Sequence, residues 1–122
     1  MVNKKILAVD DEISLLMFID DFLSRYSYSV TTCTDAIKAI DIIKSEVDGF
    51  DLIITDQTMP GMTGLEFVKQ IRALKNNVPV ILCSGYNDVI DKNEIKDHGV
   101  SFYLQKPVGN AQLLKCIEQL LP

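Results

Sequence analysis

The chain has 122 residues, a hydrophobic content of 48% and a formal net charge of −5 at pH 7. This length suits one domain over residues 1–122 with a buried core, and the acidic balance disfavours direct nucleic-acid binding, because phosphate contacts need a basic face. No apolar stretch approaches the roughly 18 residues of a membrane helix, and the apolar run after the basic N-terminus is too short for a signal peptide, so we expect a cytoplasmic protein without membrane contact.

Strand patterns and helix patterns alternate along the chain. Short apolar runs predict buried strands at residues 6–9, 28–33, 51–55, 80–83 and 100–104. Apolar residues at helical spacing follow each run, over residues 15–26, 37–43, 67–74, 87–98 and 113–121, and the fourth of these helices carries few apolar residues. Five strand–helix units with short connections predict an α/β fold, in which a doubly wound, five-stranded parallel sheet has helices on both faces.

Capping residues mark the ends of several of these helices. Thr34 or Asp35 is the expected N-cap of the second helix, and Thr63 with Glu66 matches a capping box for the third. Gly99 is expected to end the fourth helix in the left-handed conformation.

The chain has three cysteines, which are Cys33, Cys83 and Cys116. Their odd number and the absence of a CxxC spacing argue against a disulfide framework and against a zinc site. Each lies in an apolar run or on a helix face, which favours buried free thiols.

Polar residues follow the C-terminal ends of four of the predicted strands. They are Asp10, Asp11, Asp56, Ser84 and Lys106. In an open α/β sheet, ligands bind outside the carboxyl ends of the strands, so residues from most of the sequence are expected to meet at one edge. Three carboxylates, a hydroxyl and an ammonium at one place suggest chemistry with a cation and an anion.

The predicted carboxylate cluster favours a divalent cation. Like charges at close range repel and raise each other's pKa, and a cation relieves this repulsion. Oxygen-only ligands at a compact site suit Mg²⁺, which binds through one or two carboxylates plus a phosphate. By itself, Asp10-Asp11-Glu12 is also typical of the acidic start of a helix, and only the joint placement with Asp56 favours the metal site.

The remaining residues of this edge suit a phosphoryl group. Lys106 can pair with a carboxylate at rest and with a phosphoryl oxygen later, although a solvated surface lysine is the usual alternative. Ser84 can donate a hydrogen bond to an anion or merely form a turn with Gly85, which leaves room for a ligand beside the backbone. Asp56 is a candidate nucleophile, because a carboxylate can attack phosphorus and form an aspartyl phosphate.

The chain carries four sequence motifs, which are Val9–Glu12, Ile54–Gly64, Ser84–Gly85 and Tyr103–Pro107. In this order and at this spacing they resemble the receiver domain of bacterial two-component signalling, the family of the chemotaxis response regulator. The resemblance covers the full length of the chain. It implies a flavodoxin-like strand order of 2-1-3-4-5.

The resemblance also implies a role for each residue of the site. Asp56 is the expected phosphoacceptor. Mg²⁺ is expected on Asp11, Asp56 and the backbone carbonyl of Thr58, with Asp10 acting through water. The implied phosphoryl-binding and switching residues are Lys106, Ser84, Gly85, the aromatic switch Tyr103, and Pro107 after a cis bond. Ser84 stands where Thr is commoner in the family, which keeps the hydroxyl and loses a methyl group.

The same resemblance implies the partners. A sensor histidine kinase or a histidine phosphotransfer protein is the expected phosphoryl donor, and the downstream protein is expected on the surface of the fourth helix, the last strand and the last helix. A homodimer is a further option. The motifs from Asp56 to Gly64 and from Ile81 to Tyr86 are similar to receivers at the C-terminus of hybrid sensor histidine kinases, and a stand-alone regulator is the alternative.

Two other functions remain as rival hypotheses. A Mg²⁺-dependent phosphohydrolase usually has a second acid two residues after its aspartyl nucleophile, where this chain has Thr58. A docking domain that never receives phosphate would not need Asp11, Asp56 and Lys106 together. The chain has no ATP-binding glycine motif and no phosphodonor histidine, so we expect a signalling module that catalyses only its own phosphorylation and dephosphorylation. The Tyr86 ring is further expected to shield the acyl phosphate from water.

Overall fold

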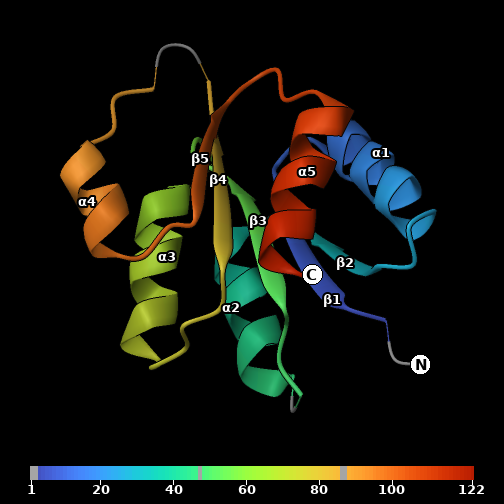
Figure 1. Cartoon of the computed structure of the whole chain (residues 1–122). Coiled ribbons are helices and arrows are strands. Elements are labelled where there is room, and N and C mark those ends of the chain that lie inside the picture. The colour runs from blue at the N-terminus through green and yellow to red at the C-terminus, as the bar shows by residue number, and fades with distance from the viewer. Residues whose placement is uncertain (1–2, 47, 86–87) are drawn as a thin grey trace.

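A computed structural model describes residues 3–46, 48–85 and 88–122 of the chain. Within these residues, strands and helices alternate from one end to the other (Figure 1). Their bounds are β1 (Lys5–Val9), α1 (Ile13–Ser24), β2 (Ser29–Cys33), α2 (Ala36–Ser45), β3 (Leu52–Asp56), α3 (Gly64–Ala73), β4 (Val80–Ser84), α4 (Lys92–Asp97), β5 (Phe102–Gln105) and α5 (Asn110–Leu120).

The described strands form one parallel sheet in the order β2-β1-β3-β4-β5. This confirms the predicted α/β class and the flavodoxin-like strand order. The central strand β3 is buried along its whole length, as is β4 beside it. Strands that are covered on both faces read as continuous apolar runs, which is why these segments were visible in the sequence.

Helices cover both faces of the sheet. Side chains alternate between the two faces of a strand, so each strand contributes to two separate cores. One core joins alternate strand residues such as Ile6 and Ile54 to α1 and α5, and the other joins residues such as Leu7 and Ile53 to α2 and α3. The two cores fix the sheet between helical layers and thereby fix the positions of the strand ends.

The expected helix caps are present. The Asp35 carboxylate accepts hydrogen bonds from the amides of Ile37 and Lys38, so Asp35 and not Thr34 is the N-cap of α2. Thr63 and Glu66 form the predicted capping box of α3. Gly99 has a φ of 70° after α4, as a left-handed helix end requires.

The fourth helix is shorter than the sequence predicted. The expected range began at Asn87, which lies outside the described residues, and α4 begins only at Lys92. The Asp91 carboxylate caps α4 by accepting a hydrogen bond from the Asn93 amide. An N-cap residue has a non-helical backbone, so the helix begins directly after Asp91. The strand β5 also begins later than predicted, at Phe102 and not at residue 100. The Val100 amide donates to the carbonyl of Ile95 in α4, so Val100 belongs to the end of the helix and not to the sheet.

Gly64 lies in close contact with the end of β3. A Cβ atom at this position would lie 2.3 Å from the Asp56 carbonyl oxygen and 2.7 Å from Leu82 Cδ1. The Gly64 amide also donates to the Gln57 carbonyl, so the start of α3 is tied to the chain directly after β3. The missing side chain therefore allows α3 to pack against the backbone that carries Asp56.

We predict that Gly64→Ala destabilises the protein by about 2 to 3 kcal/mol, because the added methyl overlaps a backbone carbonyl that cannot move away. Alanine ordinarily stabilises a helix relative to glycine, so a loss has to come from this contact. Urea unfolding measures the change. Gly109→Ala is the matched control, since a Cβ there meets nothing within 4 Å, and it should cost less than about 1 kcal/mol. Equal losses in the two variants would contradict the explanation.

Candidate functional site

The C-terminal ends of four strands meet at one edge of the sheet. Asp10 directly follows β1, Asp56 ends β3, Ser84 ends β4 and Lys106 directly follows β5. In Figure 1 these ends lie at the top of the sheet. Asp10, Asp56 and Ser84 are buried, which is uncommon for such residues unless they are paired.

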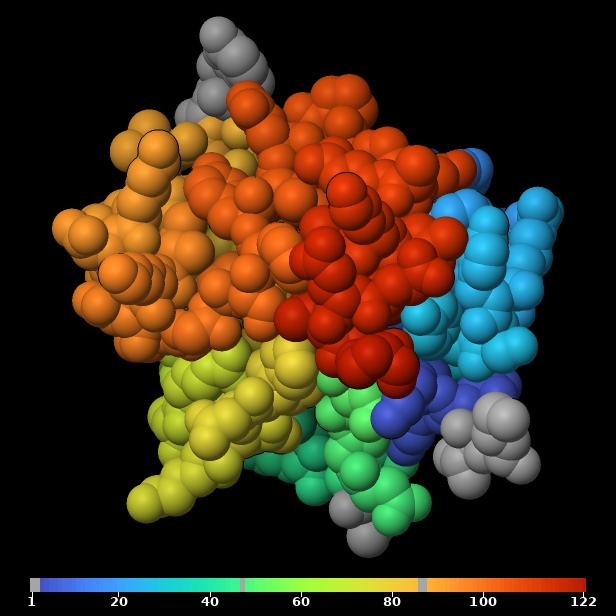
Figure 2. Space-filling view, in the orientation of Figure 1, coloured from blue at the N-terminus to red at the C-terminus, as the bar shows by residue number. Residues whose placement is uncertain are grey.

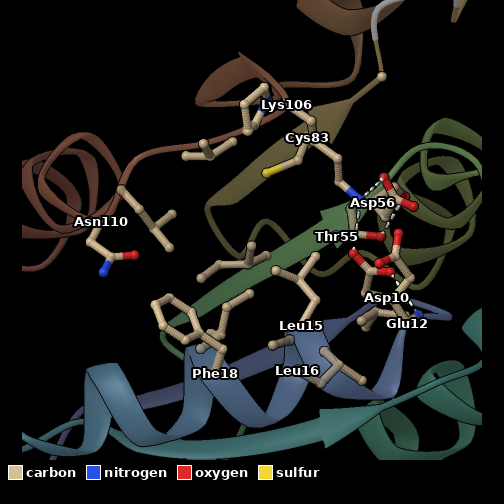
Figure 3. Close-up of a pocket in the computed structure, with 18 residues that line it drawn as sticks. Asp10, Glu12, Leu15, Leu16, Phe18, Thr55, Asp56, Cys83, Lys106 and Asn110 are labelled. Atoms are coloured by element: carbon tan, nitrogen blue, oxygen red, sulfur yellow. Dashed lines mark hydrogen bonds and ion pairs between the residues drawn. The ribbon is translucent and has the colours of Figure 1, made fainter.

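Lys106 joins two of the carboxylates. Its Nζ lies 3.1 Å from Asp10 Oδ2 and 3.1 Å from Asp56 Oδ1, and Figure 3 shows the side chain reaching from β5 to both. Burial of the ammonium acts to lower the pKa of Lys106, but its hydrogen bonds to Asp56 and Asp10 outweigh this and raise it. Lys106 is therefore held in its charged form.

For Asp56, the effect of burial on the pKa outweighs the effect of the hydrogen bond. Burial raises the pKa of Asp56, the hydrogen bond from Lys106 lowers it, and the nearby charge of Asp10 raises it again, so that the net shift is upward. The ammonium of Lys106 therefore does not fully offset the cost of burying the charge of Asp56.

The third carboxylate makes the group a candidate metal centre. Oxygen atoms of Asp10, Asp11 and Asp56 lie within 4.8 Å of one another, and Asp11 is exposed to solvent. With Lys106 included, three negative charges and one positive charge leave a net charge of −2. This charge and an oxygen-only donor set fit a divalent cation such as Mg²⁺. The Glu12 amide donates to Asp10 Oδ1 at 2.9 Å, which orients that carboxylate.

The hydroxyl at the end of β4 is paired with the aromatic residue of β5. Ser84 Oγ lies 2.6 Å from the Tyr103 hydroxyl, and either can be the donor. Ser84 is fully buried, whereas Tyr103 is 38% exposed, so a partly exposed tyrosine reaches a buried hydroxyl. The peptide bond between Lys106 and Pro107 is cis.

Sequence reasoning missed two polar residues near the site. The buried Gln57 accepts a hydrogen bond from the Leu65 amide through Oε1 and thereby orders the turn after Asp56. Asp88 Oδ1 lies 2.5 Å from Thr58 Oγ1, and Asp88 Oδ2 accepts from the Gly85 amide at 2.7 Å. The only available signal for Asp88 was its place as the first acid after Ser84. Tyr86, which was expected to shield the site, lies outside the described residues.

A cavity of about 380 Å³ lies beside the cluster, between α1 and α5 (Figure 3). It is lined mainly by apolar residues such as Leu15, Phe18 and Leu113, and it reaches Asp56 and Cys83. Burial raises the pKa of Cys83 to about 12, so its thiol stays protonated and is not a nucleophile. All three cysteines are free and buried, as predicted.

Comparison with known proteins identifies the class of protein to which this fold and site belong. The response regulator receiver domain family matches residues 6–118. The two-component response regulator ARR14 of Arabidopsis thaliana is 36% identical over 109 residues, which are 89% of this chain and 28% of that protein. Sporulation initiation phosphotransferase F of Bacillus subtilis is 27% identical over 122 residues, or 100% of this chain and 97% of that one.

Solved structures agree with the sequence comparison. The chemotaxis response regulator CheY4 of Vibrio cholerae superposes with a TM-score of 0.86 at 34% identity, covering 98% of this chain and 99% of that one. A receiver domain protein from Clostridium thermocellum gives a TM-score of 0.89 at 27% identity, covering 97% and 94%.

The chain belongs to the response regulator receiver domain family and is a receiver domain of two-component signalling. It spans only 28% of the length of ARR14, whereas it spans nearly all of the Bacillus subtilis protein. In the described residues, no helix is long and apolar enough to cross a membrane.

The raised pKa of Asp56 predicts a pH-dependent effect of Asp56→Asn on stability. A carboxyl with a raised pKa in the folded state stabilises folding below its unfolded pKa, and this contribution is lost as the pH rises through the folded value. In metal-free buffer, Asp56→Asn should therefore raise the free energy of unfolding at about pH 7.5, on the order of 1 kcal/mol, and less at about pH 4.

Denaturant unfolding at the two pH values measures this difference. Asp41→Asn, an exposed position on α2, removes the same charge elsewhere and should give no such gain. The same gain for Asp56→Asn at both pH values would show that ionisation of Asp56 is not its source.

Proposed function

We propose that this receiver domain accepts a phosphoryl group on Asp56 from a phosphohistidine in a Mg²⁺-dependent reaction and then changes conformation to signal to a partner. The observation that carries the proposal is the sharing of one lysine between two buried carboxylates. Lys106 Nζ lies at 3.1 Å from Asp10 and from Asp56, in a cluster that keeps a net negative charge. Such an arrangement is costly for stability, and it suits a site that binds a cation and an anion.

The chemical step requires little from the protein beyond position and charge. An Asp56 carboxylate oxygen bonds to phosphorus, the phosphorus–nitrogen bond of the donor breaks, and its electron pair stays on the imidazole nitrogen. Lys106, freed from one of its carboxylates, would pair with a phosphoryl oxygen, and the Ser84 hydroxyl and the Gly85 amide would donate hydrogen bonds to the others. Positioning and neutralisation of this kind account for most of the catalysis of phosphoryl transfer.

Mg²⁺ would be held by Asp11, by Asp56 and by the backbone carbonyl of Thr58, with Asp10 acting through water. The ion, when bound, supplies charge neutralisation at the phosphoryl oxygens. Three carboxylates within 4.8 Å of one another and their net charge support this role.

The partners follow from the same proposal. The donor is a sensor histidine kinase or a histidine phosphotransfer protein, and the reaction takes place in the cytoplasm, where ATP supports such kinases. Stand-alone regulators and receivers of hybrid histidine kinases both fit the site. A phosphohydrolase is less well supported, because Thr58 and not an acid stands two residues after Asp56.

The signalling surface is formed by α4, β5 and α5. Figure 2 shows these elements side by side on one continuous face. Only Ile95 is buried among the residues of α4, so few apolar contacts hold this helix in place. New contacts of Ser84 with a phosphoryl oxygen would compete with its 2.6 Å contact with Tyr103 and so alter this face.

One prediction of this proposal concerns the phosphoacceptor. In the presence of MgCl₂ and a small phosphoryl donor such as acetyl phosphate, intact mass analysis should show one phosphate adduct on the wild-type chain. Asp56→Asn and EDTA should each abolish it, because they remove the nucleophile and the cation. Asp41→Asn, with the same loss of charge on the exposed side of α2, should leave the adduct unchanged.

The outcomes separate the functions. Turnover of varied phosphoesters without a stable adduct would identify a phosphohydrolase. A wild-type chain that takes up no phosphate under any of these conditions would contradict the receiver function and would favour a docking domain.

A further prediction of the proposal concerns the signalling surface. Addition of beryllium fluoride with MgCl₂, which mimics a phosphoryl group on Asp56, should change amide hydrogen exchange at residues 88–103, because few buried contacts hold α4. Mass spectrometry of peptides measures the change, and α2 serves as an internal reference that should not respond. Unchanged exchange across residues 88–103 would exclude this segment as the output surface.

A further inference from the structure

Asp88 makes two hydrogen bonds at the edge of the phosphoryl site. Its Oδ2 accepts from the Gly85 amide at 2.7 Å, and its Oδ1 lies 2.5 Å from the Thr58 hydroxyl. The second contact joins residues that are 30 positions apart in the chain, one after β3 and one after β4. Both carboxylate oxygens of Asp88 are therefore occupied by groups from the two loops that border Asp56.

These contacts lie at the site and not beside it. Asp88 lines a pocket whose other walls include Asp56, Lys106 and Gly85. The Gly85 amide is one of the donors that a phosphoryl group on Asp56 would need. In the structure this donor is already used by an anion from the chain itself.

Helix capping does not explain the contacts of Asp88. The N-cap of α4 is Asp91, which accepts from the Asn93 amide, and α4 begins at Lys92. Asp88 bonds backward to Gly85 and across to Thr58, so its carboxylate holds the loop after β4 against the loop after β3.

We infer that Asp88 is a positioning residue that sets how readily the site accepts a phosphoryl group, by occupying the Gly85 amide until a phosphoryl oxygen displaces it. This inference rests on the proposed function of Asp56. A hydrogen bond made only in the unphosphorylated state stabilises that state, and its free energy opposes phosphoryl binding. The contact between Asp88 and Thr58 also stabilises the unphosphorylated state.

The experiment is a titration of the ¹⁵N-labelled 122-residue chain with beryllium fluoride in MgCl₂, followed by NMR. Asp88→Ala frees the Gly85 amide in advance, so its half-saturating concentration should be about three- to tenfold lower than that of the wild type. Asp88→Asn keeps an acceptor oxygen without the charge, and its half-saturating concentration should fall between the two.

Asp91→Asn is the matched control. It removes one negative charge from the same segment, and Asp91 has no hydrogen bond to Gly85 or Thr58 in the described residues. Its half-saturating concentration should stay within about twofold of the wild type. An unchanged or higher value for Asp88→Ala would overturn the inference, and so would an equal decrease in Asp91→Asn, since charge alone would then explain both.

The Gly85 amide resonance supplies a second readout that needs no phosphoryl mimic. Loss of its bond to a carboxylate should move this resonance upfield in ligand-free Asp88→Ala and leave it in place in Asp91→Asn. If the wild type binds beryllium fluoride but Asp88→Ala binds it equally well, only the role of Asp88 is wrong. If the wild type does not bind it at all, the proposed function of Asp56 fails, and the role of Asp88 fails with it.

Discussion

The contact of one ammonium with two buried carboxylates is the constraint on which the rest of this site depends. Lys106 comes from the end of β5, Asp10 from the end of β1 and Asp56 from the end of β3. Three strands must therefore hold their ends within a few ångströms of one another, although the charges they carry sum to a negative value. Removing Lys106 alone would leave two carboxylates buried without their counter-ion, which is far more costly than the pair is worth.

The parallel sheet makes this arrangement possible. Its two cores pack against alternate residues of the same strands, so the strand ends cannot shift independently. On the β3 side, the absence of a side chain at Gly64 lets α3 pack directly on the Asp56 carbonyl. Asp56, the proposed phosphoacceptor, thus stands on a rigid backbone, as precise positioning of a reacting group requires.

The β4 side of the site is held in a different way. The loop after Ser84 is tied by polar contacts of Asp88 to Gly85 and Thr58, and α4 has a single buried residue. Polar contacts can be exchanged for contacts with a bound group, whereas a packed core cannot rearrange in small steps. A rigid Asp56 beside a loosely held α4 is the arrangement that the proposed function requires, because one part is modified and another part is recognised by the partner.

The sequence by itself determined the fold class, the order of elements and the residues at the strand ends, because buried parallel strands read as apolar runs and their polar ends are conspicuous. It also limited the cap of α2 to Thr34 or Asp35 and predicted the capping box of Thr63, because caps depend on neighbouring residues. Tertiary structure decided where α4 begins, that Ser84 pairs with Tyr103, and that Asp88 bonds to Thr58. Those features join atoms from separate loops, and no local pattern records which acceptor a given donor will find when the sheet brings the loops together.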